Sequence, residues 1–142
     1  MDDPLERARE YFDRRTAIAL CATVNPDGTP DICLLIAPRM TPDDQLAAGE
    51  EKDVSGNTFR NLRQNPRATI VVLDPIMDPR ARDGCRVQAE FLGAEEDGKE
   101  LKHLSEWLEG FAPGRRVVRR LLFKILHVEA YRPRDQGPVL LQ

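Results

Sequence analysis

Apolar residues fall in short blocks along this chain, and the spacing within each block separates helices from strands. Leu5, Ala8 and Phe12 recur at helical spacing among charged residues, which predicts an N-terminal helix within residues 1–14. A second amphipathic stripe over residues 101–110 also has helical spacing and includes the only tryptophan of the chain. We expect this stripe to serve packing rather than cofactor binding.

Two apolar runs of strand length, residues 17–24 and 32–36, flank the turn sequence Asn25-Pro26-Asp27-Gly28 and predict a β-hairpin. Neither run alternates with polar residues, so both faces of the hairpin are expected to be covered. A small closed barrel whose outer wall is buried by a helix or a second subunit would have this pattern. Residues 45–48 predict a short third strand.

The second half of the chain predicts three more strands or strand-like segments. Residues 68–73 are rich in β-branched residues and are expected to form a central strand. Residues 85–91 alternate between apolar and polar side chains, which predicts a strand with one wet face. The basic run 115–120 is interpreted as a short helix or turn with a solvated face, and residues 123–131 as the last strand.

In that last strand Leu126, Val128 and Ala130 are expected to share a face with Lys124. About six strands with few helices predict a mainly β protein, a compact six-stranded antiparallel barrel. Its length predicts a single domain over residues 1–142. Strands that are apolar on both faces in so small a barrel favour a homodimer.

The stretch between the third and fourth strands predicts a short helix with a polar, glycine-containing start. Ser55 is a good N-cap residue, and Pro66 ends the helix. The backbone amides of Gly56, Asn57 and Thr58 have no partner within such a helix, and they carry the positive end of its dipole. Glycine allows a ligand to approach the backbone, so this start is predicted to be an anion site for a phosphate group.

Composition and charge exclude several classes of partner. A formal net charge of −3 and 6% aromatic residues provide neither a basic footprint nor a stacking platform for nucleic acid. No apolar run approaches the roughly eighteen residues of a membrane span, and the N-terminus is acidic, so we expect a cytoplasmic protein. Cys21, Cys33 and Cys85 lack metal spacing, which predicts buried, reduced thiols and no metal site. Residues 134–142 are expected to form a flexible tail.

Four segments together resemble a known family. They are residues 22–30 on the hairpin, 58–68 through the short helix, 84–90 on the alternating strand and 128–133 at the end. In this order they are similar to the pyridoxamine 5′-phosphate oxidase-like family of flavin-binding split β-barrels, over residues 15–133. The short, general FMN-binding members are more similar than the oxidases themselves, because the longer C-terminal substrate segment of the oxidases has no evident counterpart.

The resemblance implies a homodimer with two FMN molecules at the subunit interface and an oxidoreductase activity. The phosphate would lie near the start of the short helix, and the isoalloxazine ring would lie along the second and third strands. The residues implied to contact the cofactor are Leu34, Leu35, Ile36, Ala48, Ser55, Gly56, Asn57, Thr58 and Asn61. The flavin itself would perform the chemistry with a small-molecule substrate or electron donor, so no catalytic side chain is named.

The sequence departs from the family pattern at the implied phosphate site. Asn57 stands where the family has a lysine or arginine, and Glu50 and Glu51 add negative charge in the predicted loop before it. Lys52, Arg60 or an arginine of a partner subunit could replace the missing charge. Loss of one charge-assisted contact would weaken FMN about ten- to a hundredfold.

Two other classes of function stay open. The barrel could bind a deazaflavin or haem, and His103 and His127 are the candidate ligands for a haem iron. Alternatively, it could be a cofactor-free dimer with a structural or partner-binding role. The absorbance spectrum of the purified protein distinguishes these classes, because flavins and haem absorb at different visible wavelengths.

Overall fold

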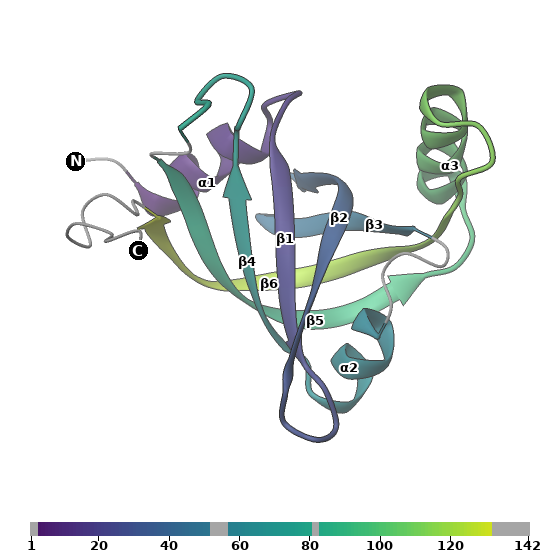
Figure 1. Ribbon diagram of the computed structural model, residues 1–142, viewed down its shortest axis with the longest axis horizontal. Helices are drawn as coiled ribbons and strands as arrows, with labels where there is room; N and C mark the ends of the chain where they lie inside the picture. The colour runs from purple at the N-terminus through teal and green to yellow at the C-terminus, as the bar shows by residue number, and fades with distance from the viewer. Residues whose placement is uncertain (1–2, 52–56, 81–82, 132–142) are drawn as a thin grey trace, which may run out of the picture.

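The computed structural model describes residues 3–51, 57–80 and 83–131. Within these ranges six antiparallel strands close into a barrel in the order β1-β2-β3-β6-β5-β4, with three helices around it (Figure 1). The elements are α1 (Pro4–Phe12), β1 (Ile18–Val24), β2 (Pro30–Met40), β3 (Gln45–Glu51), α2 (Thr58–Gln64), β4 (Arg67–Leu73), β5 (Gly84–Glu95), α3 (Lys99–Phe111) and β6 (Val117–Tyr131). The predicted six-stranded antiparallel barrel is confirmed. None of the helices described is long and apolar enough to cross a membrane.

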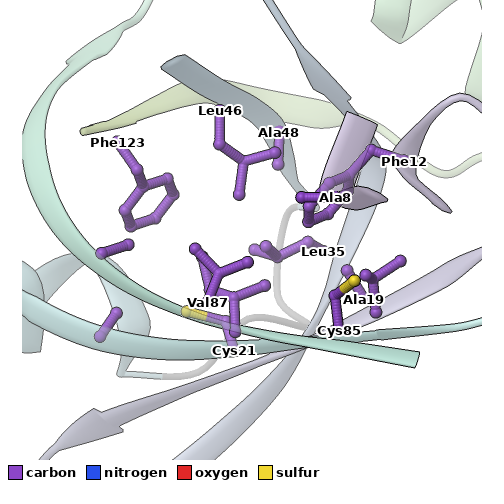
Figure 2. Close-up of a cluster of buried hydrophobic side chains, with 14 of the residues drawn as sticks. Ala8, Phe12, Ala19, Cys21, Leu35, Leu46, Ala48, Cys85, Val87 and Phe123 are labelled. Atoms are coloured by element: carbon purple, nitrogen blue, oxygen red, sulfur yellow. The ribbon is translucent and has the colours of Figure 1, made fainter. Parts of the chain in front are cut away.

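Alternating residues of the strands fill the inside of the barrel. Figure 2 shows Leu46, Val87 and Phe123 among the side chains that meet there, and all three are fully buried. Helix α1 closes one end of the barrel, since Ala8 and Phe12 pack into the same cluster. The protein's own side chains therefore occupy the interior, and a sizeable ligand has to bind outside the barrel.

The outer face of the β1–β2 hairpin is apolar and largely exposed. Ile18, Leu20, Ile32 and Leu34 on this face have exposed fractions between 37% and 65%. At the end of the same face, Ile36 is buried against α3. Helix α3 thus covers the outer face of the hairpin at Ile36, as expected. Coverage of the remaining outer face by a second subunit stays a prediction.

The basic run 115–120, predicted as a short helix or turn, belongs mostly to β6, which begins at Val117. That prediction is wrong because the arginines of this run are paired across the sheet. Arg119 is opposite Glu50 on β3 and Arg120 is opposite Glu95 on β5, with N–O distances of 2.9 and 2.5 Å. Paired charges allow a basic segment to lie within a sheet.

A β-bulge at Leu126 changes which residues of β6 face inward. The register with β5 passes from Ile125 to His127, so Leu126 is an extra residue. Val128 is therefore buried while Leu126 is 38% exposed. The predicted common face of Leu126 and Val128 with Lys124 is wrong, because strict alternation does not continue through a bulge.

Candidate functional site

A half-open groove of about 840 Å³ lies between α3 and the outer face of β2. Leu34 and Ile36 of β2 and Leu104 and Leu108 of α3 form much of its floor. Ile36 and Leu108 are buried and, together with Val117, hold α3 against the barrel. Small-molecule and cofactor sites are mostly apolar and measure roughly 300–1,000 Å³. The groove therefore has the size and the lining of a ligand site.

A β-bulge between Ile36 and Arg39 shapes the rim of this groove on β2. Ala37 lies in the bulge with a φ of 46°, a left-handed conformation that is uncommon for a residue with a Cβ atom. Arg39 follows at the groove, and its Nη1 donates hydrogen bonds to the carbonyls of Phe12 and Pro38 at 2.9 and 2.8 Å. Bulges commonly re-aim side chains beside sites, and here the bulge brings a guanidinium to the rim.

Two aromatic rings on α3 also line the groove. Trp107 and Phe111 are four residues apart and stack, with ring centroids 6.0 Å apart and an interplanar angle of 3°. Their exposed fractions are 53% and 76%. Leu101 and Leu108 of the same helix pack inward as predicted, whereas Trp107 lies to one side of that buried stripe. An exposed aromatic pair beside an apolar groove is a surface suited to binding.

Positive charge surrounds the apolar floor. Arg15, Arg39 and Arg115 line the groove, and the Arg15 side chain is exposed. Arg115 donates to Glu51 from Nε (2.6 Å) and from Nη2, and this contact raises the pKa of Arg115 above its ordinary value. Guanidinium groups bind phosphate and carboxylate oxygens through paired N–H donors. An apolar floor, stacked rings and a cationic rim together suit a planar anionic ligand.

Glu50 and Glu51 are buried at the end of β3 rather than in the predicted acidic loop, with exposed fractions of 6% and 4%. Glu50 accepts a hydrogen bond from Nη1 of Arg119 (2.9 Å), whose guanidinium lies 4.1 Å from the centre of the Phe59 ring. Glu51 is bound by Arg115. The loop prediction is wrong because arginines from much later in the chain neutralise both carboxylates.

Helix α2 begins at Thr58, with Asn57 as its N-cap residue. Asn57 is exposed, and its side chain makes no capping hydrogen bond with a described residue. Ser55 and Gly56, two of the predicted phosphate contacts, lie outside the described residues. The predicted contacts that can be placed here are therefore Asn57, Thr58 and Asn61.

Thr58 and Asn61 are fully buried and connect α2 to the β1–β2 hairpin. The Asn61 amide donates hydrogen bonds to Thr23 Oγ1 (3.1 Å) and to Asn25 Oδ1 (2.9 Å). Thr58 lowers the pKa of the Cys33 thiol on β2. The Asn61 side chain thus points toward the hairpin.

Two carboxylate oxygens near the start of α2 have no hydrogen-bond donor within residues 3–51, 57–80 and 83–131. They are the buried Asp31 Oδ2 and Glu50 Oε2. Both carboxylates act electrostatically on Cys33, the residue that Thr58 contacts. A phosphate dianion would add negative charge where acceptors already lack donors. The described residues beside the start of α2 thus bring negative charge, whereas those of the groove bring positive charge. The phosphate contact at α2 stays a prediction, because Ser55 and Gly56 lie outside the described residues.

The four strand residues predicted to lie beside a flavin ring point to two sides of the sheet. Leu34, which is 43% exposed, and Ile36 point out of the barrel at the groove. Leu35 and Ala48 lie with their side chains in the barrel core, 3% and 1% exposed (Figure 2). Five further groove residues used here were not among the predicted site residues: Arg15, Arg39, Trp107, Phe111 and Arg115. His103, which also lines the groove, was predicted only as a haem ligand. The spacing of the two aromatic residues on one helix was the available signal.

The two histidines named as haem ligands lie in different surroundings. His103 on α3 lines the groove and also a neighbouring hollow of about 410 Å³. His127 is exposed on β6, beside the bulge and opposite Gln88 of β5. Of the two, His103 is therefore the one at the candidate site.

No family model and no curated protein matches this sequence. Solved structures do match. An FMN-binding protein from Syntrophomonas wolfei subsp. wolfei is 20% identical, with 98% of this chain and 88% of that chain covered and a TM-score of 0.72. A protein of the pyridoxinephosphate oxidase family from Clostridium acetobutylicum, related to general stress protein 26 of B. subtilis, is 16% identical, with 92% and 91% covered and a TM-score of 0.63.

A heme binding protein from Mycobacterium smegmatis is 18% identical, with 92% of this chain and 55% of that chain covered and a TM-score of 0.59. These likenesses confirm the predicted resemblance to flavin-binding split barrels at the level of the fold. They also show that proteins named for different cofactors share this fold. The choice of cofactor has to come from the site.

Proposed function

We propose that this protein is a homodimeric FMN-binding oxidoreductase whose flavin lies in the groove between α3 and β2. The groove carries the proposal, because it joins an apolar floor at Leu34 and Ile36 to the stacked Trp107 and Phe111 and to a rim of arginines. Two of the residues predicted to lie beside the ring are in that floor. The likeness of fold to an FMN-binding protein supports the same cofactor.

In this site the aromatic and aliphatic side chains would hold the isoalloxazine ring, and the exposed Arg15 and Arg39 would bind the phosphate. An aromatic contact contributes about 0.5–1.5 kcal/mol beyond the burial of area. When bound, the flavin supplies the redox chemistry between a small-molecule donor and an acceptor. The chain's own residues orient the ring and limit the access of water to it.

The proposed homodimer is inferred from the outer face of the β1–β2 hairpin. Ile18 and Leu34 belong both to the groove and to the exposed apolar face that continues through Leu20 and Ile32. A second copy of the chain laid on this face would bury it and cover the open side of the groove. Light scattering after size exclusion measures the mass, and a monomer at micromolar concentration would contradict this part of the proposal.

Haem is the second candidate, because His103 lines the groove and a heme binding protein shares the fold. A histidine nitrogen is a common ligand of haem iron, and the rim arginines would face the two propionates. A deazaflavin would use the same floor and rings as FMN. Both alternatives make their own predictions for the spectrum.

The test is the absorbance spectrum of the purified protein, recorded again after incubation with FMN or with haem and desalting. Flavin bands that are retained in stoichiometric amount support the proposal. A Soret band that disappears in His103→Ala supports haem in its place. A chain that stays colourless after both incubations retains neither FMN nor haem, and the proposed function is then wrong.

A variant of Arg15 locates the phosphate. Arg15→Gln removes one charge-assisted contact, so FMN affinity is expected to fall about ten- to a hundredfold in a fluorescence titration. Arg116→Gln is the matched control, because Arg116 is exposed and lines a separate hollow. Equal affinities of the two variants would show that Arg15 does not bind the phosphate.

A further inference from the structure

Cys21 on β1 and Cys33 on β2 are directly opposite each other in the hairpin, although they are far apart in the sequence. Both side chains belong to the barrel core, with exposed fractions of 0% and 6%. Opposed residues of antiparallel strands have Cα atoms about 4.5–5.5 Å apart, and disulfides span about 4.4–6.8 Å between Cα atoms. The hairpin therefore holds two thiols at a separation that a disulfide can bridge.

The two thiols differ in how readily they ionise. Interaction with Cys33, together with burial, raises the pKa of the Cys21 thiol well above its ordinary value. Interaction with Cys21 lowers the pKa of Cys33, and Thr58 adds to this effect, against burial and the carboxylates of Asp31 and Glu50. Cys33 is thus the thiol of the pair that ionises more readily, and a thiolate is the nucleophilic form.

We infer that Cys21 and Cys33 form a reversible intrachain disulfide when the protein meets hydrogen peroxide. The Cys33 sulfur attacks one peroxide oxygen, the O–O bond breaks, and the leaving hydroxide takes up a proton to become water. The Cys21 sulfur then attacks the sulfenic acid of Cys33, so that the S–S bond forms, the S–O bond breaks and a second water leaves. Two thiols lose two electrons and two protons, and one peroxide becomes two waters; a thiol reductant reverses the reaction.

This inference is independent of the cofactor in the groove, because both thiols and their contacts belong to the hairpin and to α2. The bond would join β1 to β2 at Cys33, whose pKa Thr58 of α2 lowers. Oxidation would therefore change the contact between the hairpin and α2. A small oxidant is required, since Cys33 is only slightly exposed.

Cys85 provides a matched control, because it is a third buried thiol of the same core (Figure 2). It lies on β5, and β4 separates β5 from β1 in the barrel. Two inter-strand spacings amount to about 9–10 Å, beyond the roughly 7 Å limit for a disulfide without backbone movement. Burial is the main cause that raises the pKa of Cys85, which makes it less reactive.

The experiment uses the full chain, treated with hydrogen peroxide, denatured with a thiol-blocking reagent and digested with trypsin. Residues 16–39 form one tryptic peptide that contains Cys21 and Cys33 but not Cys85. We expect this peptide to lose the mass of two hydrogens and to escape blocking, while Cys85 stays blocked. Reduction before blocking should restore two blocked thiols in the peptide. Cleavage before Asp27 or Asp31 should leave two fragments joined by the new bond.

Cys85→Ser is expected to oxidise like the unmodified chain, and Cys33→Ser is expected to form no disulfide. The inference is overturned if the peptide keeps two blocked thiols, if Cys33 gains oxygen without joining Cys21, or if a bond to Cys85 forms instead. The unmodified chain alone decides among these results, so a variant that fails to fold does not remove the test.

Discussion

The groove beside α3 and the start of α2 are two candidate ligand sites with opposite chemistry. The groove has a neutral apolar floor, an exposed aromatic pair and arginines at its rim. Beside the start of α2, Asp31 Oδ2 and Glu50 Oε2 have no hydrogen-bond donor among the described residues, and the Asn61 amide is bonded to the β1–β2 hairpin. A phosphate at the start of α2, which stays a prediction, would have to lie beside these acidic groups.

Arg115 is the link between the two regions. It lines the groove, and it also binds Glu51 at the end of β3, the strand that leads toward α2. Arg119 neutralises Glu50 next to it. Arg115 and Arg119 thus hold the acidic region together, while Arg15 and Arg39 are left to face a ligand.

The largest effect is expected from Arg119→Ala, which leaves Glu50 buried without its cation. The free energy of unfolding should fall by about 3–5 kcal/mol, measured by urea denaturation. Arg120→Ala is the control, since the side chain of its partner Glu95 is 36% exposed. This variant should lower the free energy of unfolding by no more than about 1 kcal/mol.

Replacing both Glu50 and Arg119 by leucine removes the two charges together and should recover most of the stability lost in Arg119→Ala. If Arg119→Ala lowers the free energy of unfolding no more than Arg120→Ala does, Glu50 does not behave as a buried charge. The acidic region would then not differ from the groove in the way described.

An intermediate effect is expected from Asn61→Ala, which removes two donors from α2 and leaves the buried Thr23 oxygen without one. The free energy of unfolding should fall by about 1–3 kcal/mol. Asn65→Ala, at the exposed end of the same helix, should change it by less than about 0.5 kcal/mol. FMN affinity should be the same in both folded variants; a selective loss in Asn61→Ala would place the phosphate at α2.

The smallest effect on stability is expected from Trp107→Ala, because the side chain is half exposed, and it should stay below about 1 kcal/mol. The effect on binding should be larger, with FMN about tenfold weaker in a flavin fluorescence titration. Glu106→Ala, at an exposed position of α3, is the control. Unchanged affinity in Trp107→Ala would remove the aromatic pair from the site.

The strands of the barrel were predictable because their patterns are local. Residues 17–24 and 68–73 show strand length and β-branched or apolar content, and the turn at 25–28 joins the hairpin. The helical spacing of Leu5, Ala8 and Phe12 predicted α1. Errors arose at β6, where a bulge at Leu126 shifts the alternation and local sequence carries no mark of it.

The candidate site was predicted in part, for a different physical reason. Leu34 and Ile36 were named through the family resemblance, but the groove exists only because α3 packs on β2 from a segment about seventy residues later. The local sequence around Glu50 predicts a loop, because it does not show that Arg119 lies opposite Glu50 in the sheet. Pairings across such separations depend on topology, which a local pattern does not contain.

The pairing of Glu50 with Arg119 and of Glu51 with Arg115 also has an evolutionary consequence. A single substitution at one of these four positions leaves a charge without its partner, so the paired positions are expected to covary among related chains.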